Sequence, residues 1–295
     1  MMHDAEIFNY DSDDGLRLAG RRHGSLAEIA LPLVCLPGLT RNAKDFDALA
    51  AIVRSSDAPR PVIAFDYRGR GGSDRSAQPG DYNVLRETQD VLIGLAQLGI
   101  DRAIFLGTSR GALILHVMAT IRGDLLAGVI LNDAGPRIEW AGIDAIRTYL
   151  TAAMPTASFE DAARSLARVH GPTFPALGPD DFLRMAKASH VEREGRIVAD
   201  YDPRLIETLG AANPNRPAIE LWEQFEALCA IPLMVIRGEH STLLSRHTVD
   251  QMAERHPGLV HLNVVGQGHP PLLETPAVAD AVLRFCRSVD DRRQG

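Results

Sequence analysis

Short, almost uninterrupted apolar runs recur along this chain, and they constrain its fold more than any other feature. Six runs stand out, at residues 33–36, 62–65, 103–106, 129–131, 233–236 and 262–265. They do not alternate polar with apolar residues, as expected for strands covered on both faces. Between them, apolar residues recur every three or four positions, as at Val84, Val91 and Leu95, which predicts helices. Strands that alternate with helices predict an α/β fold with a doubly wound, mostly parallel sheet.

Two stretches depart from this alternation. The first thirty residues hold two short runs around Asp14-Gly15, which predict an antiparallel hairpin at the edge of the sheet. Between about Pro136 and Cys229, helical patterns follow one another without a convincing strand, which predicts a helical insertion. Trp140 and Trp222 fall near its two ends, and we expect them to form an apolar wall of a substrate pocket. The alternative is that they belong to the insertion's own small core.

The charge balance and the cysteine count limit the partners. The chain has 31 Lys and Arg against 38 Asp and Glu, a net charge of -7, without a long run of either sign, which disfavours nucleic acid as a partner. The first residues lack the pattern of a secretory signal, and no stretch is apolar enough to span a bilayer, so we expect a cytoplasmic protein without a membrane partner. Cys35, Cys229 and Cys286 are expected to be reduced packing residues. A small-molecule substrate is the expected partner, and the oligomeric state stays open.

A candidate nucleophile lies between a predicted strand and a predicted helix. Residues 107–111 read Gly-Thr-Ser-Arg-Gly, directly after the run at 103–106 and before the helical stretch that starts at Ala112. This order puts Ser109 on a sharp strand-to-helix turn, where close packing leaves no room for a Cβ two residues before or after it. The alternative is a turn whose serine only caps the helix.

The nucleophile needs a base, and His269 is the strongest candidate. It lies in the loop 266–271, immediately after the last predicted strand, at the same sheet edge as Ser109. His240 and His247 follow the preceding strand and remain minor competitors. No His-Glu-x-x-His or comparable ligand spacing occurs, so we expect neither a catalytic metal nor a cofactor.

An oxyanion needs two preorganised donors. The backbone N–H of Arg110 follows the nucleophile, and the loop 36–40, which ends an earlier strand, offers the N–H of Leu39 beside Gly38. We expect these two N–H groups to form the oxyanion hole. If Ser109 is not the nucleophile, the loop is an ordinary Pro-Gly turn.

These motifs resemble the α/β-hydrolase superfamily, specifically its members with an inserted cap. The resemblance rests on six stretches in family order: residues 36–42 (LPGLTRN), 66–74 (DYRGRGGSD), 107–111 (GTSRG), 132–136 (NDAGP), 237–241 (RGEHS) and 268–272 (GHPPL). It implies a doubly wound, mostly parallel sheet of the α/β-hydrolase type. It also implies a core of residues 1–136 and 230–295 with a helical cap (lid) at 137–229.

The acid of the triad departs from the family pattern. Thr242 occupies the place where the family usually has its acid, and a hydroxyl cannot stabilise the imidazolium that forms during acyl transfer. Asp133, directly after the run at 129–131, is the strongest substitute, because some members of the superfamily place the acid after that strand. Glu239 is the second candidate. The alternative for Asp133 is that it only caps the following turn.

The loop 66–74 raises a separate question, because Asp66 and Asp74 flank an Arg-Gly-Arg-Gly-Gly run. It lacks the Lys-Ser or Lys-Thr of a phosphate-binding loop. We expect a structural turn with internal Asp–Arg pairing.

The sequence therefore predicts a cofactor-free, carboxylesterase-like serine hydrolase. Its substrate would be an ester, a lactone or an activated carbon–carbon bond of a small, largely apolar carbonyl compound. Ser109 would attack, His269 would transfer the proton, and Asp133 would orient and stabilise the histidine. Two alternatives stay open. One is a low-turnover protein that binds a small ligand, and the other is a lyase or cofactor-free oxygenase in which His269 is the base.

Overall fold

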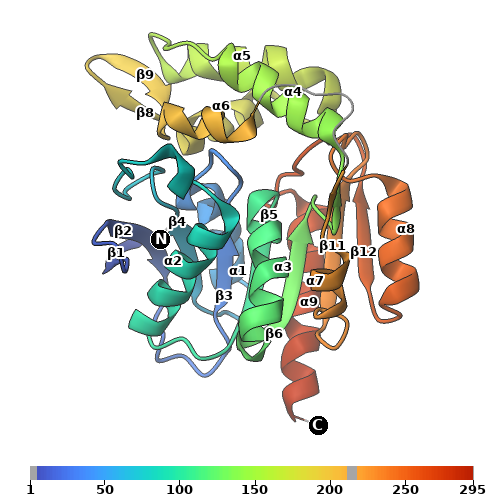
Figure 1. Ribbon diagram of the computed structural model, residues 1–295. Coiled ribbons are helices and arrows are strands. Elements are labelled where there is room, and N and C mark those ends of the chain that lie inside the picture. Colours follow the sequence, from blue (N-terminus) through green and yellow to red (C-terminus); the bar gives the residue numbers. More distant parts are fainter. Residues whose placement is uncertain (1–4, 211–217, 295) are drawn as a thin grey trace.

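The computed structural model describes residues 5–210 and 218–294, and its centre is an eight-stranded sheet (Figure 1). The strand order is β1-β2-β4-β3-β5-β6-β11-β12. β2 is antiparallel to β1 and to β4, and the other neighbours are parallel. The strands are β1 (Glu6–Asp11), β2 (Arg17–His23), β3 (Leu33–Leu36), β4 (Val62–Asp66), β5 (Ala103–Thr108), β6 (Leu126–Asn132), β11 (Leu233–Gly238) and β12 (Val260–Val264). The predicted doubly wound sheet and the hairpin at its edge are confirmed.

The burial of the strands explains why their sequences are so apolar. Every residue of β3, β4, β5 and β6 is buried, because helices cover both faces of the sheet. β12 differs, since it is an edge strand and its first two residues are exposed. It begins at Val260 and ends at Val264, so the apolar run at 262–265 places it about two residues too late.

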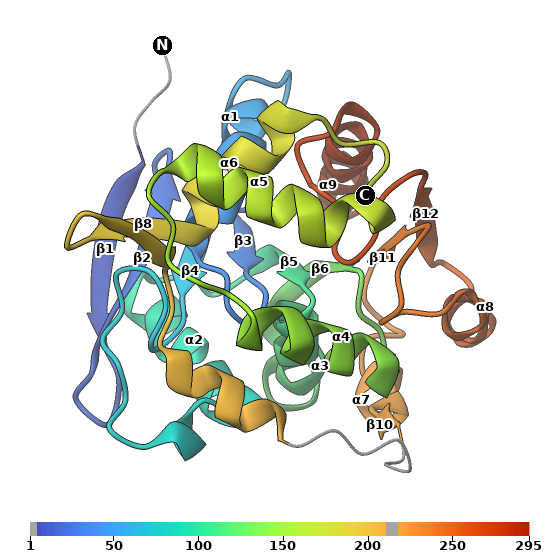
Figure 2. The same ribbon diagram turned by 90° about the horizontal axis from the view of Figure 1, so that it is seen from above.

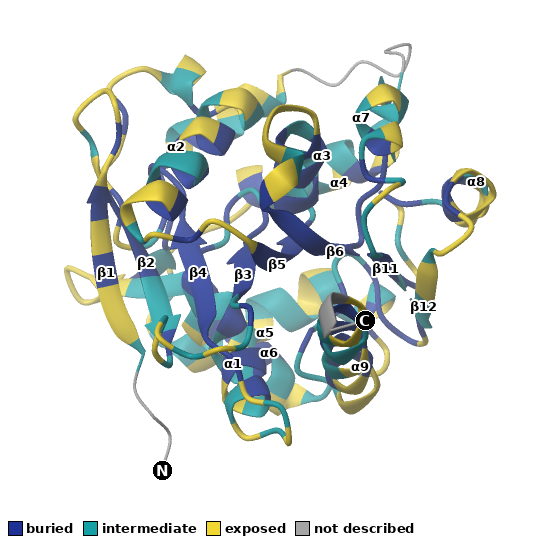
Figure 3. Ribbon diagram, turned by 90° about the horizontal axis from the view of Figure 1, so that it is seen from below, coloured by how far each residue is buried: buried dark blue, intermediate teal, exposed yellow. Residues whose placement is uncertain are grey.

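Helices pack on both faces of the sheet, as Figure 3 shows from below. One face carries α2, α3 and α7, and the other carries α1 and α9. The helices of the core are α1 (Asp47–Arg54), α2 (Val84–Gln97), α3 (Arg110–Arg122), α7 (Trp222–Glu226), α8 (Arg246–Arg255) and α9 (Pro276–Gln294). The Asn83 side chain accepts a hydrogen bond from the N–H of Arg86 and so caps α2. α9 begins at Pro276, as its Thr-Pro start predicts.

The segment between β6 and α7 lies over the end of the sheet, as seen from above in Figure 2. Its helices are α4 (Trp140–Thr151), α5 (Phe159–His170) and α6 (Pro179–Ser189). The expectation that it has no strand is wrong, because it contains β7 (Arg137–Ile138), β8 (His190–Arg193), β9 (Arg196–Ala199) and β10 (Ile219–Glu220). β8 and β9 form a hairpin through Glu194 and Gly195, both at positive φ. These strands have two to four residues each, so they leave at most a short apolar run in the sequence.

In the part of the chain that the structure describes, no helix is both long enough and apolar enough to cross a membrane. The three cysteines are free, and Cys35 and Cys286 are buried. Burial raises the pKa of the Cys286 thiol to about 11.

Candidate active site

Ser109 lies on the turn between β5 and α3, in a strained backbone conformation with φ 52° and ψ -107°. The two flanking glycines are required by the packing of this turn. A Cβ on Gly107 would lie 2.5 Å from the carbonyl carbon of Gly111, and a Cβ on Gly111 would lie 2.2 Å from the carbonyl oxygen of Leu36. Neither position can hold a larger residue without a shift of the backbone, so the turn presents Ser109 where β5 ends.

A continuous hydrogen-bond chain connects Ser109, His269 and Asp133. Nε2 of His269 lies 2.9 Å from Oγ of Ser109, and Nδ1 of His269 lies 2.8 Å from Oδ2 of Asp133. An ionised carboxylate can only accept, so Nδ1 carries the proton and Nε2 is left to accept from the serine hydroxyl. The arrangement can therefore take the proton of Ser109 when its oxygen attacks a carbonyl carbon.

Asp133 is held from two sides at the end of β6. Its Oδ1 accepts a hydrogen bond of 2.9 Å from the N–H of Gly238, and its own N–H donates to the carbonyl oxygen of Ile236 at 2.8 Å. The side chain is fully buried, whereas that of His269 is 12% exposed. Both bonds come from β11, the neighbouring strand, so the carboxylate is fixed with Oδ2 directed at the histidine.

The other candidates for acid and base lie elsewhere. Oε2 of Glu239 accepts from the N–H of Gly266 at 2.8 Å, and Thr242 is exposed. His240 lies beside Glu239, and His247 is exposed on α8. The structure thus brings Ser109, His269 and Asp133 together and leaves the competing residues apart from them.

The loop after β3 brings Leu39 to Ser109. A Cβ on Gly38 would lie 3.8 Å from Cβ of Ser109, so this loop is in close contact with the nucleophile. The carbonyl of Gly38 accepts from the N–H of Arg41 at 3.2 Å, which fixes the peptide plane that carries the N–H of Leu39. Within residues 5–210 and 218–294, the N–H groups of Leu39 and Arg110 have no acceptor. Both are therefore free to bind an oxyanion.

A buried ion-pair cluster lies behind these two donors. Arg70 donates from Nε to the carbonyl oxygen of Leu39 at 2.8 Å, and its Nη1 lies 2.7 Å from Oε1 of Glu87. The other carboxylate oxygen of Glu87 accepts from Nε of Arg110. Burial raises the pKa of Glu87, but the guanidinium groups of Arg110 and Arg70 outweigh it and hold the pKa below its usual value. One carboxylate thus links both sides of the candidate oxyanion hole.

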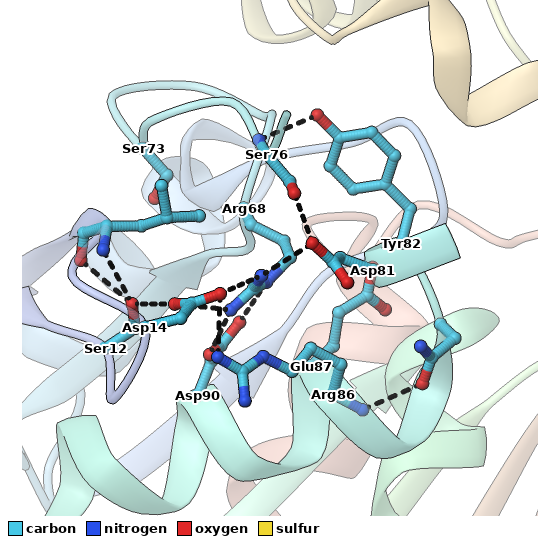
Figure 4. Close-up of polar contacts among 12 residues, drawn as sticks. Ser12, Asp14, Arg68, Ser73, Ser76, Asp81, Tyr82, Arg86, Glu87 and Asp90 are labelled. Carbon is cyan, nitrogen blue, oxygen red and sulfur yellow. Dashed lines mark hydrogen bonds and ion pairs between the residues drawn. The ribbon is translucent and has the colours of Figure 1, made fainter. Parts of the chain in front are cut away.

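The expected pairing within the loop 66–74 is wrong. Arg68 instead pairs with Asp90 on α2, at 2.7 Å, and with Asp14 in the edge hairpin, at 2.9 Å (Figure 4). The carboxylate of Asp66 accepts from the backbone N–H groups of Ala43 and Gly72, at 2.7 and 2.9 Å. The backbone of the loop crowds Asp66 so closely that its oxygens meet N–H groups rather than a guanidinium.

Two cavities meet at Ser109. The larger has a volume of about 810 Å³ and is lined mostly by apolar side chains, among them Trp140, Ile143 and Leu113. The smaller, of about 170 Å³, lies on the side of His269 and is more polar. Ser109 and Leu39 line both cavities, so a carbonyl group at the nucleophile would have one substituent in each.

The two tryptophans differ in their relation to the larger cavity. Trp140 lines it from the first turn of α4. The expectation for Trp222 is corrected, since its neighbour Leu221 lines the cavity and Trp222 does not. Its ring packs against Phe225 and lies under the guanidinium of Arg255, 4.2 Å from the ring centroid. Trp222 begins α7, and this contact directs its side chain toward α8.

A serine, a histidine and a buried aspartate, each following a strand of one doubly wound sheet, define the hydrolase class of α/β proteins. A model of the alpha/beta hydrolase family matches residues 33–281, and the chain belongs to this family. It is a hydrolase, as its named relatives are.

Three comparisons show the range of these relatives. A solved α/β hydrolase from Novosphingobium aromaticivorans is 36% identical with a TM-score of 0.88, over 97% of this chain and 99% of that chain. A 3-hydroxybutyrate-oligomer hydrolase from Cupriavidus necator is 29% identical over 83% of this chain and 84% of the relative. A 2-(acetamidomethylene)succinate hydrolase from Mesorhizobium japonicum is 27% identical over 79% of each.

Proposed function

We propose that the protein is a serine hydrolase that cleaves an ester, a lactone or an activated carbon–carbon bond of a small, largely apolar carbonyl compound. The observation that carries this proposal is the hydrogen-bond chain from Asp133 through His269 to Ser109, with distances of 2.8 and 2.9 Å, at an apolar cavity. The names of the Cupriavidus and Mesorhizobium relatives support hydrolysis of small carbonyl compounds. Among the three bonds, we take the ester as the first to test.

The proposed reaction has two halves. Oγ of Ser109 bonds to the carbonyl carbon while its proton passes to Nε2 of His269, and the N–H groups of Leu39 and Arg110 bind the oxyanion. The tetrahedral intermediate collapses, and the leaving alcohol takes the proton from His269. Water then attacks the acyl-enzyme and gives a proton to Nε2 of His269, which passes it to Oγ of Ser109 as the acid leaves. All these groups belong to the chain, so the proposal needs no metal or cofactor.

We further propose that residues 137–229 act as a cap that shapes the substrate site over the core of residues 1–136 and 230–295. Side chains of α4 support this, because Trp140, Ile143 and Ile146 line the larger cavity. A mostly apolar lining around the hydroxyl of Ser109 suits a small apolar acyl group with one reactive carbonyl.

The alternatives of a ligand-binding protein and of a His-base enzyme are separated by their kinetics. The low-turnover alternative is favoured by Thr242 at the usual place of the acid, whereas the 2.8 Å contact of Asp133 with His269 supports turnover. A His-base enzyme would keep activity without the serine but not without the histidine.

The test is the hydrolysis of 4-nitrophenyl acyl esters of increasing chain length by the wild type and by Ser109→Ala, His269→Ala and His240→Ala. We expect turnover by the wild type and by the His240→Ala control, and a loss of several orders of magnitude in kcat for the other two variants. Turnover that survives Ser109→Ala but not His269→Ala would support the His-base alternative. Tight, reversible binding of the ester without turnover by the wild type would support the ligand-binding one.

A further inference from the structure

The two cavities at Ser109 have different chemical roles in an acyl transfer. The leaving alcohol must take a proton from Nε2 of His269, so it departs on the side of the histidine. Among the described residues, His269 lines the smaller cavity and not the larger one. The acyl group of the substrate therefore belongs in the larger, apolar cavity, and the alcohol portion belongs in the smaller one.

Arg41 gives the smaller cavity a cationic donor close to the nucleophile. A Cβ on Gly38 would lie 3.3 Å from Cγ of Arg41 and 3.8 Å from Cβ of Ser109, so both side chains start close to Gly38. Arg41 binds Asp45 through Nε and Nη2. Its Nη1 has no hydrogen-bond acceptor within residues 5–210 and 218–294. One edge of the guanidinium is thus free for a ligand in this cavity.

Lys44 and Arg184 also line this cavity, as does Asp45, and both cations are paired with carboxylates as Arg41 is. Nζ of Lys44 is bound to Asp200 at 3.0 Å. Arg184, 48% exposed, contacts Asp181 and lies 3.6 Å from Glu274. Burial raises the pKa of Glu274 above its usual value.

His170 also lines the smaller cavity. Burial, with the charges of Arg41 and His269, lowers its pKa to about 4, so it is neutral at neutral pH. We take Arg41 as the anion-binding group of this cavity, because its side chain starts close to Gly38 and Ser109 and its Nη1 has no acceptor among the described residues.

We propose that the smaller cavity binds the alcohol portion of the ester and that Arg41 binds a carboxylate on it, so that the substrate is an acyl ester of a short hydroxy acid. This inference rests on the proposed function of Ser109 and His269. The size of the cavity agrees with it. A cavity of about 150 Å³ holds a molecule such as benzene, so about 170 Å³ suits an alcohol of about six non-hydrogen atoms. A guanidinium edge matches a carboxylate in geometry and in charge.

The test compares two esters that differ only in the charge of the leaving group, the hexanoyl esters of glycolic acid and of glycolamide. The ratio of their kcat/KM values, acid over amide, is measured for the wild type, for Arg41→Gln and for Arg184→Gln. We expect this ratio to fall at least tenfold in Arg41→Gln and by less than threefold in Arg184→Gln, which removes a positive charge from the rim of the same cavity. The comparison of ratios cancels the intrinsic reactivity of the two esters.

The double variant Arg41→Gln/Asp45→Asn removes the ion pair as a whole, and we expect the same fall in the ratio of kcat/KM values.

A second experiment measures inhibition of the wild type and needs no variant. We expect free glycolate to inhibit the hydrolysis of 4-nitrophenyl hexanoate at a concentration at least tenfold lower than glycolamide does. Equal inhibition by the two compounds would overturn the proposal. An equal change of the ratio in the Arg41 and Arg184 variants would also overturn it.

The failure of this proposal can be told apart from a failure of the proposed function. If the wild type cleaves neither ester but a fluorophosphonate still labels Ser109, the assignment of the smaller cavity is wrong and the serine chemistry stands. If a fluorophosphonate does not label Ser109 either, the proposed function itself is wrong.

Discussion

Asp133 and Asp90 are both fully buried and both paired, yet their partners differ in kind. Asp90 on α2 faces Arg68, with distances of 2.7 and 2.8 Å, and the charge of an arginine is permanent. Asp133 at the end of β6 faces His269, which carries a charge only when it is protonated. The first pair holds the loop after β4 against α2 and the edge hairpin (Figure 4). In the second pair, His269 can gain and lose a proton.

This difference shows that a buried carboxylate is not by itself a sign of catalysis. A permanent cation exchanges no proton with its partner, so the pair only stabilises one arrangement of the chain. A titratable partner next to a cavity keeps a proton available for the reaction. Glu87 is paired only with permanent cations, Arg70 and Arg110, but Arg70 also binds the carbonyl oxygen of Leu39 at the candidate oxyanion hole.

The largest expected effect is that of Asp133→Asn. Asparagine keeps an acceptor for the N–H of Gly238 but cannot stabilise the imidazolium, so kcat should fall by about 10⁴ while thermal stability changes little. The measurement is the kcat of ester hydrolysis together with thermal unfolding, with Glu239→Gln as the matched control. Full activity of Asp133→Asn would remove Asp133 from the mechanism.

Asp90→Asn should act on stability instead. It leaves Arg68 with a buried charge that Asp14 neutralises only in part, so the free energy of unfolding should fall by about 3 kcal/mol. The kcat per folded molecule should stay within about twofold of the wild type. Urea unfolding and active-site titration of the same samples check both statements. A large loss of kcat in fully folded protein would contradict the separation of the two pairs.

His116 on α3 is a third case, a buried titratable group with no charged partner among the described residues. Burial lowers its pKa to about 4, although its bond to the carbonyl oxygen of Ala112 opposes this. The unfolded chain takes up the proton near pH 6.5, so stability is present above that pH and is lost as the pH falls toward 4.

His116→Leu should reduce this loss by up to about 3 kcal/mol at pH 4, as the difference between the two pKa values implies. The measurement is the free energy of unfolding from pH 7 to pH 4. If the wild type and His116→Leu lose stability in parallel, His116 is not the source of the loss.

Glu87→Gln is expected to have a smaller effect on kcat than Asp133→Asn, because Glu87 acts only by positioning the oxyanion hole. With a weaker link between Arg70 and Arg110, the N–H groups of Leu39 and Arg110 should fit the oxyanion less well. We expect kcat to fall about tenfold, about 1.4 kcal/mol in the barrier, with little change in KM. Asp81→Asn is the control, because Asp81 belongs to the Arg68 cluster and is 39% exposed. A change in KM without a change in kcat would show that Glu87 does not act on the oxyanion hole.

The sequence predicts the core of this fold well because its strands are apolar over their whole length. It predicts the segment between β6 and α7 less well, since the strands of the hairpin β8–β9 have only four residues each and β8 is mostly polar. The sequence also gives the wrong direction for the side chain of Trp222, because the contact of Trp222 with Arg255 depends on how α7 and α8 pack. Such packing is not encoded in local patterns.

For the site, the sequence places Ser109 and His269 by motif, and the structure brings Asp133 to them although Thr242 occupies the usual position of the acid. Arg70 and Glu87 were missed because their pairing joins distant parts of the chain. One signal could have found Glu87. It lies three residues after Val84 and four before Val91, on the apolar face of the predicted helix, where an acid needs a buried partner.

The central claim is that His269 activates Ser109 as a nucleophile, and covalent labelling tests it most directly. The intact mass of the protein is measured after incubation with a fluorophosphonate, followed by peptide mapping, with Ser109→Ala and His269→Ala alongside. We predict one phosphonyl group per chain on Ser109, no labelling of Ser109→Ala, and strongly slowed labelling of His269→Ala. Absence of labelling in folded wild-type protein, or labelling at another residue, would contradict the claim.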